Sequence, residues 1–82
     1  MNLQTARNIE RNINATADAY TFARRTLSDA MRAVNIARRD CDDIAAENAA
    51  HGLRAANRDV NHARARYTAA LLHAEMTRAA LA

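Results

Sequence analysis

The chain has no proline and only one glycine, Gly52, in its 82 residues. Proline breaks helices and glycine weakens them, so a sequence almost free of both can form long uninterrupted helices. Alanine, the strongest helix former, accounts for 22 residues, whereas the aromatic residues that favour strands make up only 4%. The sequence therefore predicts an all-α protein.

Two heptad tracts indicate how the helices pack. In each tract a mostly large residue recurs every seven positions, and a small residue, usually alanine, follows it three positions later. This alternation allows large side chains of one helix to lie over alanines of the other. We call these positions the heptad seam: Ala6, Ile9, Ile13, Thr16, Tyr20, Ala23, Leu27, Ala30, Val34 and Ala37 in the first tract, and Leu53, Ala56, Val60, Ala63, Tyr67, Ala70, Ala74, Thr77 and Leu81 in the second.

The two tracts are nearly equal in length, so folding them antiparallel about a point near residue 43 gives almost full overlap, with Tyr20 and Tyr67 at similar height. This alternation of large residues and alanines along an antiparallel hairpin resembles that of the Rop-type plasmid regulators. Those proteins are dimeric hairpins that bind RNA. The present chain is longer and has a charged connector, and no functional residue is carried over from the resemblance.

The residues between the two tracts break the heptad register and hold most of the boundary signals. Asp40 and Asp43 have the spacing of a capping box, and Gly52 suits the position just after a helix. Cys41 lies at a heptad position, which favours a buried structural thiol. We therefore expect one domain over residues 1–82, an antiparallel helical hairpin or small helical bundle with a long, a short and a long helix. Their expected bounds are about 3–39, 41–51 and 53–81.

Two alternative divisions of the chain remain open. A single turn near Gly52 gives a long first helix of about 48 residues that faces a shorter second one. A turn at Thr26–Asp29, where threonine and aspartate have capping spacing, gives three helices of about 25 residues. All three divisions are all-α.

The hydrophobic core is thin for a chain of this length. Of the residues in the 50% apolar fraction, 22 are alanine, which contributes one methyl group each. Large apolar side chains off the seam, such as Phe22, Leu72 and Met76, leave more apolar surface than one hairpin can cover. Small scaffolds commonly solve this problem by self-association. We therefore expect a homodimer, and these three residues form one candidate contact surface.

A second candidate contact surface is basic. All 12 basic residues are arginine, and the net charge of +3 arises in residues 50–82. Four-residue steps place several of these side chains in a row on one helix face, away from the seam. We call this set the arginine row: Arg54, Arg58, His62 and Arg66, extended by His51 and His73 and flanked by Asn57 and Asn61. It suits docking to an acidic protein surface or to phosphates, and an ordinary solvated face is the alternative interpretation.

Catalysis and metal binding find little support in the sequence. The histidines are spaced 11 residues apart, about 16 Å along a helix, which is too far for one metal ion. Cys41 is the only cysteine, and no Gly-rich phosphate loop or nucleophile–base pair is present. We expect no enzyme activity, no cofactor and no metal. The chain lacks an apolar run of transmembrane length, so we expect a cytoplasmic protein without membrane contact.

These features predict a helical, coiled-coil-like protein–protein interaction module that binds and regulates or inhibits a larger assembly. We expect its partner to be a protein with an acidic surface. Phage and plasmid accessory proteins, including inhibitors of the anti-CRISPR type, are often of this size. The alternative is a Rop-like regulator that binds RNA or DNA through the arginine row, and steep salt dependence of binding would distinguish it.

Overall fold

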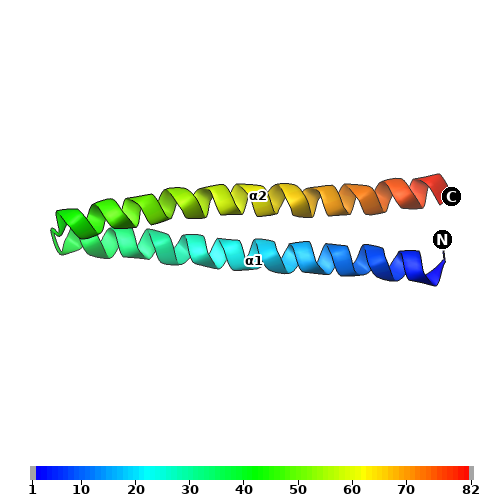
Figure 1. Cartoon of the computed structure of the whole chain (residues 1–82), viewed down its shortest axis with the longest axis horizontal. Helices are drawn as coiled ribbons and strands as arrows, with labels where there is room; N and C mark the ends of the chain where they lie inside the picture. Colours follow the sequence, from blue (N-terminus) through cyan, green and yellow to red (C-terminus); the bar gives the residue numbers. More distant parts are fainter. Residues whose placement is uncertain (1, 82) are drawn as a thin grey trace.

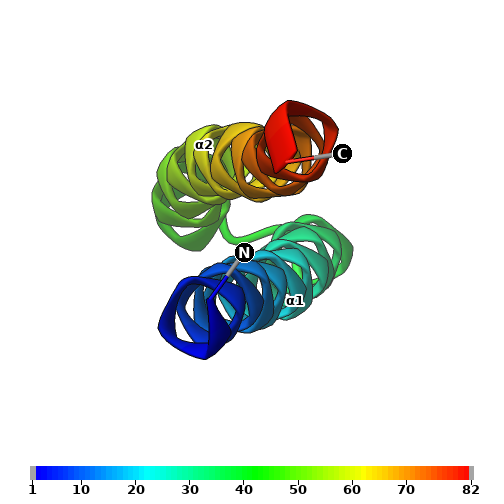
Figure 2. The same cartoon turned by 90° about the vertical axis from the view of Figure 1, so that its right-hand side faces the viewer.

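The computed structural model describes residues 2–81 and consists of two long antiparallel helices joined by a short turn (Figure 1). Helix α1 is Leu3–Arg39 and helix α2 is Asp43–Leu81. The hairpin is narrow, with extents of 60 × 15 × 13 Å. Figure 2 shows the two helices winding around each other, as a seven-residue repeat requires. The predicted all-α antiparallel hairpin is confirmed.

Helix α1 begins and ends where the sequence predicts. The Asn2 side chain caps its first turn, since Oδ1 accepts a hydrogen bond from the Thr5 backbone N–H at 2.7 Å. Arg38 and Arg39 lie in the last turn, where positive charge is favoured beside the unpaired carbonyl groups.

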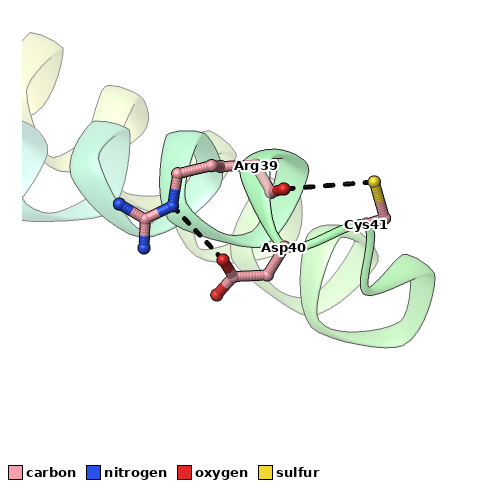
Figure 3. A network of polar contacts seen from close by, with 3 residues as sticks. All are labelled: Arg39, Asp40 and Cys41. Atoms are coloured by element: carbon pink, nitrogen blue, oxygen red, sulfur yellow. Dashed lines mark hydrogen bonds and ion pairs between the residues drawn. The ribbon is translucent and has the colours of Figure 1, made fainter.

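The turn that follows α1 has the hydrogen bonds of a Schellman motif. The Cys41 N–H donates to the Arg38 carbonyl and the Asp42 N–H to the Ala37 carbonyl, both at 3.1 Å. Cys41 occupies the left-handed position of this motif with φ 54°. The predicted burial of Cys41 is therefore wrong: its side chain is exposed, with Sγ 4.0 Å from the Arg39 carbonyl oxygen (Figure 3).

Capping of α2 also differs from the prediction. Asp42 is the capping residue, because its Oδ1 accepts a hydrogen bond from the Ala45 backbone N–H at 3.0 Å. Asp40 instead ends α1 and pairs with the neighbouring Arg39, whose Nε lies 3.2 Å from Oδ1 (Figure 3). The spacing of Asp40 and Asp43 was thus a coincidence of composition and not a capping box.

We expect Cys41→Gly to raise the free energy of unfolding by about 0.5–1 kcal/mol. A left-handed backbone costs a residue with a Cβ atom roughly 1–2 kcal/mol, and the greater freedom of glycine in the unfolded chain offsets part of that gain. Thermal denaturation of both proteins at one concentration measures the difference. Cys41→Ala, which keeps the Cβ atom, is the control and should give no such gain.

The division of the second half into a short and a long helix is wrong, because α2 runs without interruption through Gly52. Gly52 does not have a positive φ, so it does not end a helix. Ala46 and Ala49, seven residues before Leu53 and Ala56, are half-buried, and they carry the second heptad tract back to the start of α2. The break in heptad register lies in the turn at 40–42, and the alternative turns near Gly52 and at 26–29 are likewise absent from the described chain.

The core follows the heptad seam. The most buried residues of α1 and α2 all belong to it: Thr16, Ala23, Val34, Ala37, Ala56, Val60, Ala70 and Ala74. Counting outward from the turn places each large residue opposite a small one, for example Leu27 against Ala56 and Ala23 against Val60. Tyr20 and Tyr67 lie together as predicted, with ring centroids 6.1 Å apart. Leu81 is the exception, since 55% of its surface is exposed.

Candidate interaction surfaces

A groove of about 390 Å³ follows the junction of the two helices near the middle of the hairpin. We call it the apolar groove. Its α1 wall is Asn12, Ala15, Thr16, Ala19, Phe22, Ala23 and Thr26, and its α2 wall is Asp59, His62, Ala63 and Arg66.

The apolar groove exists because small side chains lie beside the seam at this level. Ala15 and Ala19 are too short to fill the space above Thr16, whose hydroxyl is satisfied by the Asn12 and Ile13 carbonyls at 2.8 and 3.0 Å. Phe22 stands at the edge with 70% of its surface exposed. An exposed aromatic ring lies here beside a hollow of alanines. Covering this surface with another apolar surface would lower the free energy, because apolar area is removed from water.

A second groove, of about 470 Å³, lies on the opposite face of the hairpin. Phe22 and Arg24 illustrate the separation, since residues two positions apart point about 200° apart around a helix. We call this second site the arginine groove, lined by Tyr20, Thr21, Arg24, Arg25, Leu27, Ser28, Met31, Val60 and Arg64.

Two arginines of this groove converge on one tyrosine. The Arg24 guanidinium carbon lies 5.6 Å from the centroid of the Tyr20 ring, and the Arg64 Nε donates to the Tyr20 hydroxyl at 3.4 Å. Arg25 lines the same groove, and no carboxylate is among its described lining residues. Three guanidinium groups with nearby hydroxyls produce a positive potential suited to carboxylates or phosphates.

The arginine row is not confined to one face. Each four-residue step advances about 40° beyond a full turn, so the row drifts around α2. His62 and Arg66 line the apolar groove, whereas Arg54 and Arg58 lie outside both grooves. The Arg54 guanidinium instead contacts the His51 ring nitrogen on its own helix. The remaining members, Asn57, Asn61 and His73, are exposed like the rest.

The apolar candidates also separate. Phe22 lies in the apolar groove, opposite His62 and Arg66 of the arginine row. Met76 and His73 lie instead near the open end of the hairpin, in a shallow depression formed with the first turn of α1. Leu72 is 54% exposed and lines none of these depressions. The structure thus brings part of the arginine row together with part of the apolar contact surface, although the two were predicted as alternative binding sites.

The arginine groove was not predicted from the sequence. Arg24 and Arg64 each follow a small seam residue, Ala23 and Ala63, by one position. That pattern places both arginines beside the seam, on the same side of the hairpin. Sequence reasoning considered the arginines of the second half alone and so missed the contribution of α1.

Charged groups elsewhere form weak surface contacts. The Arg32–Asp29 pair, at 3.7 Å, is exposed on both sides, as is the contact of 4.0 Å between His51 and Glu47. Residues 2–81 contain no group of three His, Cys, Asp or Glu side chains that could hold a metal ion. Neither described helix is long and apolar enough to cross a membrane.

Comparison with protein family models, with curated proteins and with solved structures gives no match.

Proposed function

We propose that this chain is a helical protein-interaction module without catalytic activity, which acts as a homodimer and binds and regulates or inhibits a larger protein assembly. The observation that supports this most directly is the distribution of its apolar side chains. Among residues 2–81, the buried apolar residues are five alanines and two valines, while Phe22, Ile44 and Met76 are 63–75% exposed. Surfaces of this kind are commonly binding sites for other proteins.

The arginine groove supplies the second part of the proposal, a surface for an acidic partner. Arginine forms bidentate hydrogen bonds with carboxylates, and Arg24, Arg25 and Arg64 bring three such groups to one groove. The groove lies on the face opposite the apolar groove. Self-association and partner binding can therefore occur at the same time.

We expect the double substitution Arg24→Glu with Arg64→Glu to abolish capture of the partner. Reversing two charges in a contact of this type typically weakens binding by several kcal/mol, and surface substitutions usually change folding stability by under about 0.5 kcal/mol each. Quantitative affinity capture from the native host, with circular dichroism as the folding control, measures both effects.

Two charge-matched variants make this experiment specific. Arg7→Glu with Arg11→Glu reverses the same number of charges near the N-terminus of α1. This variant should capture the partner as wild type does. Arg54→Glu with Arg58→Glu reverses two members of the arginine row. If that variant loses the partner and the Arg24/Arg64 variant retains it, the arginine row is the contact surface and the arginine groove is not.

A second candidate function is regulation through RNA or DNA binding. The hydroxyls of Thr21 and Ser28 lie beside the three arginines, and backbone phosphates are bound by such combinations. Neutralising three phosphates would make the affinity fall about 40-fold between 50 and 200 mM salt. Fluorescence anisotropy with RNA and DNA of mixed sequence tests this. Submicromolar binding with that salt dependence, lost in the Arg24/Arg64 variant, would favour this function over a protein partner.

A further inference from the structure

We propose that a second copy of this chain covers the apolar groove, with α1 antiparallel to α1 and α2 antiparallel to α2 across a two-fold axis at mid-hairpin. This inference rests on the proposed homodimer and specifies its face and register. The product is a four-helix bundle in which every neighbouring pair of helices is antiparallel.

The position of the axis follows from the dimensions of the hairpin. Helix α1 is centred on Thr21 and α2 on His62, and both residues lie at the level of the apolar groove. An axis between Tyr20 and Thr21 on α1 falls between His62 and Ala63 on α2, because positions equally far from the turn are level. Two hairpins related by this axis overlap along their full 60 Å length, with the turn of one beside the termini of the other.

The charges of α2 are self-complementary about this axis. Asp59 and Arg66 both line the apolar groove, seven residues or about 10 Å apart along the helix, and the ion pairs of the described residues do not include either one. In the antiparallel register Asp59 of one copy lies opposite Arg66 of the other, and the symmetry repeats the pair. A two-fold interface requires this reciprocity, since residue i must suit residue j and j must suit i.

The α1 wall is self-complementary in shape. The same axis places Phe22 of one copy over Ala19 of the other, so that each exposed ring enters the space left by a small side chain. Ala15 then faces Thr26, and Asn12 faces Asp29, which pairs a carboxylate with an amide donor. No like charges meet among the described groove residues in this register.

The face is also long. It follows the full 60 Å length of both helices, and stable interfaces bury roughly 800 Å² per partner. The arginine groove lies on the opposite face and stays open on both sides of the bundle.

A charge-exchange experiment tests the register. Asp59→Arg and Arg66→Asp, each alone, place like charges opposite one another twice, and we expect each variant to dimerise at least tenfold more weakly than wild type. Mixing the two variants pairs opposite charges at both contacts, so the mixture should form a heterodimer with near wild-type affinity. The double variant carrying both substitutions should also recover. Analytical ultracentrifugation measures all four, with circular dichroism to confirm helicity.

Arg58→Asp is the matched control, because it reverses an arginine on the same helix outside the groove and should change the dissociation constant less than twofold. A monomeric wild-type chain would contradict the proposed homodimer itself. A wild-type dimer that neither substitution weakens would leave the homodimer standing and overturn this face and register. Weakened single variants without recovery in the mixture would show that the face is correct and the register is wrong. If the apolar groove instead binds a helix of another protein, wild type and all variants should be monomeric.

Discussion

Ala70→Leu should lower the free energy of unfolding by roughly 1–3 kcal/mol, because the added side chain has no space in the seam. Ala70 is 3% exposed and packs at a level where the seam of α1 supplies Ile13. The large-over-small pairing lets the two backbones approach closely, and a leucine here must push α1 away or leave its favoured rotamer. For a domain of this size the loss corresponds to a fall in melting temperature of roughly 4–8 °C per kcal/mol.

Ala65→Leu is the control, since Ala65 is exposed on the outward side of the same helix. Leucine and alanine have similar helix propensities, so this substitution should change stability little. Both variants are melted at the same protein concentration as wild type, because the stability of a dimer depends on concentration. Equal losses at the two positions would mean that the seam is assigned to the wrong face of α2.

Phe22→Glu should raise the dissociation constant of the proposed homodimer at least a hundredfold. Burying a phenylalanine is worth about 1.5–3 kcal/mol, the two-fold symmetry counts it twice, and a hundredfold change requires only about 2.7 kcal/mol. Phe22 is 70% exposed in the single hairpin, so helicity at high protein concentration should be retained. Sedimentation equilibrium over a range of concentrations measures the constant.

Leu72→Glu provides the comparison, because Leu72 is a large apolar residue, 54% exposed, that lines neither groove. It should dimerise as wild type does. Dissociation caused by Leu72→Glu and not by Phe22→Glu would move the dimer interface to the outer face of α2.

The proposed dimer would act as an adaptor with two equivalent partner sites. A dimer joined through the apolar groove would present two arginine grooves on opposite sides. One bundle could then bind two acidic sites of the same assembly, and the gain in avidity would depend on the spacing of those sites.

The sequence alone determined the all-α hairpin, the bounds of α1 and most of the packing seam. These features depend on local propensity and on a seven-residue period, both of which can be counted along the chain. The near-equal tracts also set the antiparallel overlap that brings Tyr20 and Tyr67 together.

The tertiary structure decided that α2 continues through Gly52. Glycine within a helix costs roughly 1 kcal/mol relative to alanine, which makes Gly52 a natural boundary when it is considered alone. Continuing the helix through it leaves Ala46 and Ala49 half-buried at seam positions, while the Schellman turn at Cys41 satisfies the backbone at the end of α1 and the Asp42 cap satisfies it at the start of α2. The burial of Ala46 and Ala49 depends on the neighbouring helix, and a single-helix signal does not contain it.

The tertiary structure also decided which candidate residues meet. A row of four-residue steps looks continuous in the sequence, but it drifts around α2, so its members divide according to the position of α1. Only Arg66 and His62 of that row reach the groove that contains Phe22, and Arg24 meets Arg64 across 40 residues of sequence through their shared contact with Tyr20. The period of one helix places a side chain around its own axis, and the neighbouring helix determines which other side chains it can reach.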